Sequence, residues 1–291
     1  MATRNSSLRV VSPVWLVLIG ILSVQVGAGV AKSLFDEVAP TTIVWLRLVT
    51  SAVVLTLVAR PALRGKTRSD WLVAIGLGAS LGIMNWAIYQ SFLRIPLGVA
   101  VTLEFLGPLT LAVVGSRRLQ DLLWVAFAAI GVAVLGLAGG SGSVSLAGAL
   151  FALLAGAMWA SYILLSAQTG RRWPGIDGLA VASVVATLLL TPAAVGTGGS
   201  DLLDLRILLI GAAVGLLSSV IPYSCEMVAL RTIRPSVFSI LMSLEPAAAA
   251  LAGILVLQEF LSLQQWLAMV CIIVASVGAT RSARTVAPAP D

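Results

Sequence analysis

Charged and imidazole side chains are scarce in this chain. It has no histidine and two cysteines, and charged residues make up 10% of its 291 residues, whereas a soluble domain usually carries about a quarter. Cys225 and Cys271 lie far apart in apolar sequence and show no ligand-like spacing. The sequence therefore predicts no metal site and no disulfide framework, and both cysteines are expected to be buried small apolar residues.

Two mechanistic classes are disfavoured by the motifs that the sequence lacks. No Gly-x-x-x-x-Gly-Lys-Ser/Thr run occurs, so ATP-driven transport by this chain alone is not expected. An intramembrane enzyme would need a nucleophile with a base or a metal site, and neither His-Glu-x-x-His nor clustered cysteines are found. We therefore expect a protein that is not an enzyme. An intramembrane enzyme or a membrane scaffold is kept as a remote alternative.

Long hydrophobic runs fill almost the whole sequence. Hydrophobic residues make up 59% of it, the mean hydropathy is +1.05, and a spanning helix needs roughly 20 apolar residues. The first run is longer than the core of a signal peptide, so we expect a retained helix. Ten spans are predicted, at about 13–35, 40–60, 71–93, 97–116, 121–139, 147–168, 178–195, 206–230, 236–257 and 262–281.

The second five spans repeat the first five. Pro96 and Pro108 frame the fourth span as Pro235 and Pro246 frame the ninth, and Pro108 and Pro246 align with a shift of 138 residues. Because five is odd, the second copy must be inverted, which is typical of transporters. The sequence predicts an all-α polytopic membrane protein with a cytoplasmic N-terminus (1–12), a first five-helix repeat (13–139), an external linker (140–146), a second repeat (147–281) and a cytoplasmic tail (282–291).

Lysine and arginine are distributed unevenly among the predicted loops. The external side would keep Lys32, Arg94 and Arg206, while Arg47 falls inside a span. Basic loops stay in the cytoplasm, so both termini are expected there, and the basic balance indicates topology rather than nucleic-acid binding. Fourteen of the eighteen cationic residues would then be cytoplasmic: Arg4, Arg9, Arg60, Arg64, Lys66, Arg68, Arg117, Arg118, Arg171, Arg172, Arg231, Arg234, Arg281 and Arg284.

Polar residues inside the spans are the main functional signal. A charge at the bilayer centre costs about 3 kcal/mol, so such residues must face protein or water. Several share a helix face at i, i+3 or i+4 spacing and lie at similar depth, which predicts a polar seam around a central cavity. The candidate residues for binding substrate or protons are Glu104, Glu245, Gln25, Asn85, Tyr89, Trp159, Tyr162, Tyr223 and Glu226.

Several of these residues have a structural alternative. Glu104 precedes Pro108 by four residues and could serve the kink there, and Glu226 is close enough to Arg231 to reach the cytoplasmic interface. Trp159 and Tyr162 could be core or lipid-facing aromatics. A second set is expected to be structural, as kinks or as polar groups that pair with carboxylates, loose carbonyls or headgroups: Arg47, Lys32, Pro108, Pro222 and Pro246.

Five segments carry a family resemblance. They are Gly27–Phe35, Pro96–Pro108, Ser116–Arg118, Pro222–Met227 and Leu241–Ala247. In these segments the chain resembles the bacterial threonine/homoserine exporters, which are EamA-type members of the drug/metabolite transporter superfamily. The resemblance covers essentially the whole chain, and the fourth-span run is its most specific part. Cys225 and Thr102 depart from the pattern and could shift substrate preference.

The resemblance implies a multi-pass exporter of the bacterial inner membrane, with a cavity between two EamA repeats and efflux driven by the proton-motive force. The expected partners are a small amino acid and the lipid bilayer, with no nucleic acid and no bound cofactor; homo-oligomerisation is left open. Glu104 or Glu245 would exchange a proton for the substrate ammonium. Gln25, Asn85, Tyr89 and Tyr162 would orient the carboxylate and side chain of the substrate. The nearest alternative is an exporter of another metabolite or a drug.

Overall fold

A computed structural model describes residues 13–114, 121–137, 144–230, 233 and 235–283 of the chain. Within these ranges the chain is helical and contains no strand. Nine stretches are long and apolar enough to cross a membrane, and the shorter apolar helix Leu122–Leu135 stands where the fifth span was predicted. The all-α polytopic fold with ten spans is therefore confirmed.

The first half of the chain supplies five spans. They consist, in order, of α1 (Pro13–Lys32), α2 (Pro40–Ala59), α3 (Arg68–Phe92), α4 (Leu97–Glu104) with α5 (Leu106–Val114), and α6 (Asp121–Leu137). The fourth span is thus two short helices that meet at Phe105.

The second half repeats this arrangement with two interrupted spans. It consists of α7 (Leu146–Arg172), α8 (Asp177–Gly198) with the 3-10 turn η2 (Gly199–Leu203), α9 (Leu205–Gly215), the π-helical turn η3 (Leu216–Val220), α10 (Ile221–Leu230), α11 (Pro235–Met242), α12 (Glu245–Leu257) and α13 (Leu263–Ala283). Part of the predicted linker, the predicted N-terminal segment (1–12) and residues 284–291 of the predicted tail (282–291) lie outside the described residues.

Local sequence explains where several helices begin. Pro40 stands in the first turn of α2, where its missing N–H is not needed. At the start of α3, the Thr67 hydroxyl accepts a hydrogen bond from the Asp70 N–H at 3.2 Å, and the Asp70 carboxylate accepts one from the Thr67 N–H at 2.9 Å. This capping box satisfies two donors that the first turn of a helix leaves unpaired.

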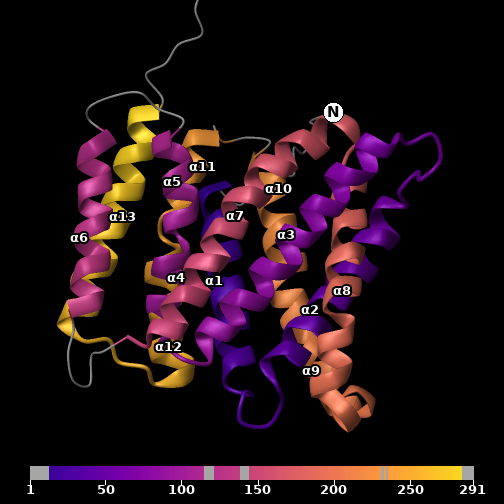
Figure 1. The fold of residues 1–291 in the computed structure, drawn as a ribbon, viewed down its shortest axis with the longest axis horizontal. Coiled ribbons are helices and arrows are strands. Elements are labelled where there is room, and N and C mark those ends of the chain that lie inside the picture. Colours follow the sequence, from indigo (N-terminus) through magenta and orange to yellow (C-terminus); the bar gives the residue numbers. More distant parts are fainter. Residues whose placement is uncertain (1–12, 115–120, 138–143, 231–232, 234, 284–291) are drawn as a thin grey trace, which may run out of the picture.

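The packing of the helices supports an inverted duplication. The first span packs on the eighth and ninth (α1 on α10 and α12), and the sixth packs on the third and fourth (α7 on α3, α4 and α5). The second span packs on the seventh (α2 on α8), and the fifth on the tenth (α6 on α13). If span 1 is taken to follow span 10, adding five to both span numbers of any of these contacts gives a contact of the same set (Figure 1). The two halves therefore interlock.

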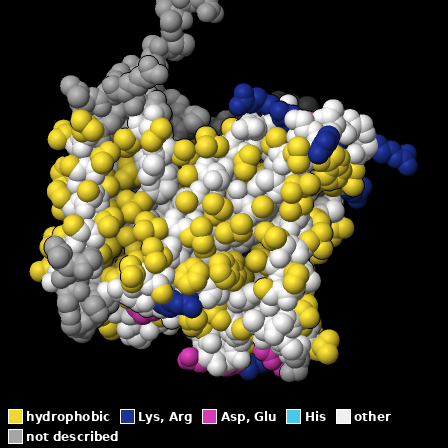
Figure 2. Space-filling model, in the orientation of Figure 1, with side chains coloured by type: hydrophobic (Ala, Val, Ile, Leu, Met, Phe, Trp, Pro, Cys, Tyr) yellow, Lys and Arg dark blue, Asp and Glu magenta, His cyan; other side chains and the backbone are white. Residues whose placement is uncertain are grey.

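The two ends of the bundle differ in charge. We call the end that carries Arg60, Arg64, Lys66, Arg68, Arg171 and Arg172 the basic end, and the end that carries Asp36, Glu37, Asp201, Asp204 and Glu259 the acidic end. Figure 2 shows the blue side chains mainly at the upper right and the magenta ones below. In Figure 1, α1 begins and α13 ends at the upper, basic end, which the positive-inside rule assigns to the cytoplasm.

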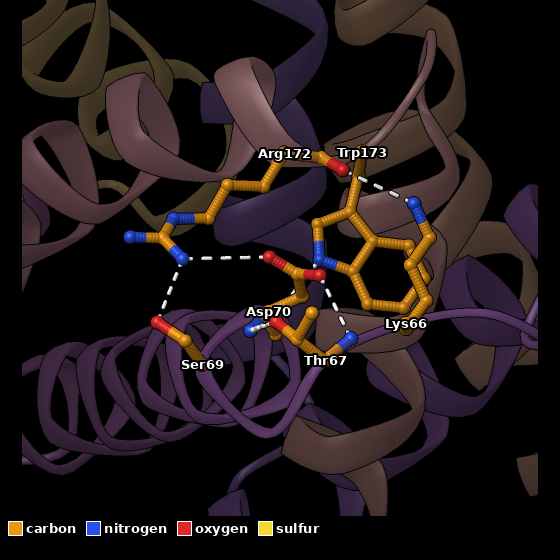
Figure 3. Close-up of polar contacts among 6 residues, drawn as sticks. All are labelled: Lys66, Thr67, Ser69, Asp70, Arg172 and Trp173. Atoms are coloured by element: carbon orange, nitrogen blue, oxygen red, sulfur yellow. Dashed lines mark hydrogen bonds and ion pairs between the residues drawn. The ribbon is translucent and has the colours of Figure 1, made fainter.

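A polar cluster joins the two halves at the basic end (Figure 3). Arg172, the last residue of α7, donates from Nη1 to the Ser69 hydroxyl at 2.7 Å and to Asp70 at 3.4 Å. The next residue, Trp173, donates from its indole N–H to the Asp70 carbonyl at 3.2 Å, and Lys66 lies 4.4 Å from the centre of its ring. These contacts tie the beginning of α3 to the end of α7.

The outer surface of the bundle is apolar. Leu57, Val58, Leu188 and Leu255 each expose about two thirds of their surface, at 68%, 69%, 65% and 67%. Figure 2 shows yellow side chains over the whole height of the face turned towards the viewer. Such a surface is unfavourable in water and suited to lipid chains. The chain is a multi-pass membrane protein.

Candidate functional site

A cavity of about 190 Å³ lies between the two halves of the bundle. Residues from α1, α2, α3, α4, α7, η3, α10, α11 and α12 surround it. It is lined by Val24, Gln25, Ala28, Arg47, Met84, Asn85, Ile88, Phe92, Val101, Glu104, Trp159, Tyr162, Ser218, Pro222, Glu226, Met242 and Glu245. Both halves of the sequence thus contribute polar groups to one central site.

The charged groups of this cavity are unbalanced. Three carboxyl groups line it, from Glu104, Glu226 and Glu245, together with one guanidinium, from Arg47. The charge of Arg47 acts on Glu104, and the charges of Glu226 and Glu104 both act on Glu245. None of the three carboxylates lies within 4 Å of a cation in the described part of the chain. The site therefore favours positively charged occupants, including protons.

Glu245 is presented by the break in the ninth span. It is the first residue of α12, 9% exposed, and Pro246 follows it in the first turn. Ser243, in the short connection from α11, shares a hydrogen bond of 2.9 Å with the Ser276 hydroxyl of α13. This bond ties the connection that precedes Glu245 to the neighbouring helix.

Glu104 ends α4 at the corresponding break in the fourth span. Pro108 has no N–H to donate to the Glu104 carbonyl, which explains why α4 stops and α5 starts anew. The backbone of α7 lies directly against this break, because a Cβ added at Gly156 would stand 2.5 Å from the Glu104 carbonyl oxygen. Two glycines, Gly107 and Gly156, make this close approach possible.

The eighth span is widened where it passes the cavity. Pro222 cannot donate to the Ser218 carbonyl, and Arg47 Nη2 donates to that oxygen instead, at 3.0 Å. Arg47 Nε reaches the Ser219 hydroxyl at 3.4 Å, and the Ser23 hydroxyl donates to the Leu217 carbonyl at 2.6 Å. Side chains from α1 and α2 thus hold the carbonyls of the π-helical turn. These two bonds leave three of the five guanidinium N–H groups of Arg47 for other partners.

The remaining lining groups are polar or aromatic. Asn85 is buried, and its amide donates to the Leu81 carbonyl at 2.8 Å. The Trp159 ring packs edge-on against Phe105 at 5.3 Å. Tyr162 lines the cavity and also a second cavity of about 190 Å³ towards the basic end, where Thr169 and Trp173 lie. Tyr162 therefore stands between the central site and the predicted cytoplasmic side.

Several residues singled out from the sequence lie away from the cavity. Tyr89 is fully buried in an aromatic cluster with Phe35 and Phe92, and the Arg47 guanidinium lies 5.9 Å from its ring centre. Pro108 and Pro246 stand in the helix breaks rather than on the cavity wall, whereas Pro222 lines it. The backbone of Tyr223 belongs to α10, but its side chain lies outside the described part of the structure.

Lys32 closes the acidic end of the bundle. Its ammonium forms an ion pair with Glu259 at 2.5 Å and donates to the Ile95 carbonyl at 2.8 Å. The Glu259 carboxylate also accepts the Leu97 N–H, at 2.8 Å. The end of α1, the start of α4 and the α12–α13 connection are thereby joined. We call this cluster of Lys32, Ile95, Leu97 and Glu259 the external clasp.

One polar residue of the cavity was missed from the sequence. Ser218 is 2% exposed and lines the site, yet it lies in an apolar run without the spacing of a polar helix face. The signal that could have found it is the pair Ser218-Ser219 four and three residues before Pro222, where a proline frees a carbonyl inside the membrane.

The inverted helical fold, its apolar outer face and its central polar cavity define the chain as a membrane transporter. It belongs to the EamA-like transporter family, which matches residues 146–281. The chain is 40% identical over 277 residues to the threonine/homoserine exporter RhtA of Salmonella typhimurium (strain LT2), and 39% identical over 277 residues to that of Escherichia coli (strain K12). Each comparison covers 94% of both chains.

A solved crystal structure of a protein shares the fold, with a TM-score of 0.62 and 19% sequence identity, covering 93% of this chain and 98% of that one. The relatives are named as exporters rather than enzymes, as the sequence led us to expect of this chain. The roles of the individual site residues stay predictions.

Proposed function

We propose that the chain exports small amino acids of the threonine and homoserine type across the bacterial inner membrane, by proton antiport with alternating access. The substrate class is supported by the 40% identity to exporters of that name over 94% of the chain. No bound cofactor is needed, because the proton-motive force supplies the energy. The partners are the amino acid and the bilayer.

The observation that carries proton coupling is the charge balance of the cavity. Three carboxyl groups and one guanidinium would leave an excess of two negative charges if all were ionised. Uncompensated charge in a membrane interior is costly, so protons or a cationic ligand must balance it. A substrate ammonium and a proton then compete for the same carboxylates, and this competition is what antiport requires.

An amino acid fits this distribution of charge in one orientation. Its ammonium faces the carboxylates of Glu104, Glu226 and Glu245. Its carboxylate faces Arg47, the one cation among the lining residues, through N–H groups that the carbonyls of the eighth span leave free. Trp159, Tyr162 and Asn85 bound the space around the side chain. The zwitterion thus meets a partner for each charge inside the membrane.

The interlocked halves and the external clasp support alternating access. Lys32 of the first repeat pairs with Glu259 of the second at the acidic end, so the halves are held together on that side. Release to the outside requires this ion pair to separate, and the cluster around Arg172 and Asp70 holds the opposite end in the same way. Rocking of one repeat against the other exchanges which end is closed.

The test is uptake of radiolabelled threonine and homoserine by proteoliposomes of the purified protein. An acidic lumen should drive accumulation, and a protonophore should abolish it. Glu245→Gln should lose accumulation driven by the gradient because it cannot exchange a proton. Glu37→Gln is the matched control, since Glu37 is 54% exposed at the acidic end, and it should behave like the unmodified protein.

Two results would count against this proposal in different ways. Normal gradient-driven uptake by correctly inserted Glu245→Gln would remove Glu245 from the coupling mechanism. Absence of transport of any amino acid by intact protein would leave the family and the fold in place and assign the cavity to another metabolite, which a panel of lipophilic cations and other small metabolites would then identify.

A further inference from the structure

The Ser218 hydroxyl is one of three buried serine or threonine hydroxyls that have no hydrogen-bond partner among the described residues, together with those of Thr56 and Thr169. Of these three residues, only Ser218 lines the central cavity. Many serine and threonine side chains in the described helices instead donate to the carbonyl four residues earlier, as Thr102 does to Gly98 at 2.6 Å and Ser183 to Leu179 at 2.9 Å. Within the part of the chain that the structure describes, Ser218 Oγ is buried without a hydrogen-bond partner. It faces the cavity from the π-helical turn η3. A buried hydroxyl without a hydrogen bond lowers the stability of the protein unless a ligand forms a hydrogen bond with it.

A second unpaired atom lines the same cavity. Gln25 is 3% exposed, and its Oε1 has no hydrogen-bond partner among the residues that the structure describes. Gln25 belongs to α1, which packs directly on η3, so the two atoms come from opposite repeats. An amide oxygen accepts a hydrogen bond, whereas a serine hydroxyl can donate or accept. Together they present the complement of one hydroxyl group, which donates one hydrogen bond and accepts another.

The surrounding structure fixes the Ser218 hydroxyl in place. The carbonyls of Leu217 and Ser218 are held by Ser23 and Arg47, so the turn cannot rewind into a regular helix without breaking two hydrogen bonds. The backbone of α1 lies against the hydroxyl, since a Cβ added at Gly27 would collide with Ser218 Oγ. A π-helical turn inside an α-helix is often found at functional sites.

We propose that Gln25 and Ser218 form a subsite that recognises the side-chain hydroxyl of the transported amino acid. This inference rests on the proposed function and names the part of the cavity that distinguishes hydroxy amino acids from apolar ones. The substrate hydroxyl donates to Gln25 Oε1 and accepts from Ser218 Oγ. Both groups are neutral and therefore suit a hydroxyl. The ammonium and carboxylate of the substrate pair with the charged groups of the cavity instead.

The size of the effect follows from what an apolar substrate leaves behind. Valine has nearly the shape of threonine but carries a methyl group in place of the hydroxyl. It would leave Gln25 Oε1 and Ser218 Oγ buried and unpaired. Sites that hydrogen-bond a substrate hydroxyl reject analogues without it far more strongly than apolar pockets reject a change of one methyl group. The unmodified protein should therefore prefer threonine to valine by about a hundredfold or more in kcat/KM.

The experiment compares threonine and valine uptake by proteoliposomes containing the unmodified protein, Ser218→Ala, Gln25→Met or Ser224→Ala. Ser218→Ala and Gln25→Met should each lower the ratio of the two kcat/KM values by about tenfold, mostly through loss of threonine transport. Ser224→Ala is the matched control, because Ser224 is exposed on α10 and its hydroxyl donates to the Val220 carbonyl at 2.7 Å. It should keep the ratio of the unmodified protein.

The possible failures are distinguishable. If the unmodified protein transports threonine and both variants keep its preference over valine, or lose both substrates equally, the subsite is wrong and the proposed function stands. If the unmodified protein transports no amino acid, both proposals fail together. Because Gln25 and Ser218 lie on different helices, one variant decides the matter if the other does not insert.

Discussion

Arg47 supports the backbone of the eighth span where that span passes the cavity. Its guanidinium donates to the carbonyl that Pro222 leaves without a helical partner, and its planar group lies near the ring of Tyr89. A bond from a charged donor to a buried carbonyl contributes about 1.5–3 kcal/mol, and removing the donor leaves the carbonyl unpaired. The structural role predicted for Arg47 from the sequence therefore has a definite geometry.

Replacing Arg47 by methionine should lower the stability of the protein. We expect a loss of about 1.5–3 kcal/mol because the Ser218 carbonyl and the Ser219 hydroxyl both lose their donor. The measurement is thermal unfolding in detergent without substrate. Arg206→Met is the control, since Arg206 and Glu37 form an ion pair with side chains 67% and 54% exposed, and such pairs contribute little. An unchanged melting temperature for Arg47→Met would contradict the structural role.

Single residues were predicted unevenly from the sequence. Gln25, Asn85, Trp159 and Tyr162 were identified by their depth and spacing, and all four line the cavity. Tyr89 shares a face with Asn85 at i, i+4 but turns into the aromatic cluster. Helical spacing fixes which residues share a face and does not fix where the neighbouring helices diverge. For that reason, it cannot separate a cavity wall from the core behind it.

At the scale of a helix, the fourth span shows how a break is packed. The helix α4 ends at Glu104, and the backbone of α7 at Gly156 lies against the Glu104 carbonyl and against Gly107. A side chain at Gly156 or Gly107 would collide with backbone atoms, so the backbone itself would have to move. The prolines predicted from the sequence mark the position of the break, whereas its tight contact depends on a glycine in a different span.

Gly156→Ala should therefore be strongly unfavourable. Its Cβ would stand 2.5 Å from the Glu104 carbonyl oxygen, and overpacking of this kind costs about 1–3 kcal/mol. Gly170→Ala in the same helix is the control, because a Cβ there meets nothing within 4 Å and alanine has the better helix propensity by about 1 kcal/mol. Thermal unfolding in detergent should show opposite shifts for the two variants. Equal shifts would show that the α7 contact is looser than described.

Breaking the external clasp should favour opening of the acidic end. Glu259→Gln removes the partner of Lys32 and weakens the bond to the Leu97 N–H, so the outward-open state should become more populated. Ala28→Cys, in a chain with Cys225→Ser and Cys271→Ser, reports this change because Ala28 is buried on the cavity wall. If the variant shifts the equilibrium towards the outward-open state by about 1 kcal/mol, an impermeant maleimide added outside should react with the introduced cysteine roughly five times faster.

The control for the clasp is Glu37→Gln in the same background, which should not change the rate. Faster labelling in both variants would indicate a general effect of charge at the acidic end rather than release of the clasp. An unchanged rate in Glu259→Gln would show that the Lys32 ion pair does not hold that end closed.

For the whole molecule, orientation in the membrane follows from the charge difference between the ends. In the cysteine-free background, Asp36→Cys should react with an impermeant maleimide in intact cells, whereas Arg64→Cys should react only after the membrane is permeabilised. Both positions are exposed in connections between spans, at the acidic and basic ends respectively. The reverse pattern would overturn the assignment of the basic end to the cytoplasm.

The number and kind of elements were predictable because hydropathy and the positive-inside rule act on whole spans. The inverted repeat was predicted from the prolines that bound the fourth span (Pro96 and Pro108) and the ninth span (Pro235 and Pro246). The contacts between spans agree with this repeat. The widened turn at Leu216–Val220 was not predicted. The carbonyls of this turn are held by hydrogen bonds from Ser23 and Arg47, which are 194 and 171 residues away from their partners in the sequence. Pro222 marks the place locally, but no local pattern identifies these distant partners.

The interlocked packing of the two halves has a consequence for how the chain is made. During synthesis α1 to α6 enter the membrane before α10 and α12, against which α1 packs, exist. Until then Gln25, Arg47 and Glu104 have no cavity to face, and Lys32 has no Glu259. Until the second repeat is inserted, the first repeat therefore holds ionisable groups at membrane depth without their partners. Biogenesis of this protein depends on whatever shelters those groups in the interval.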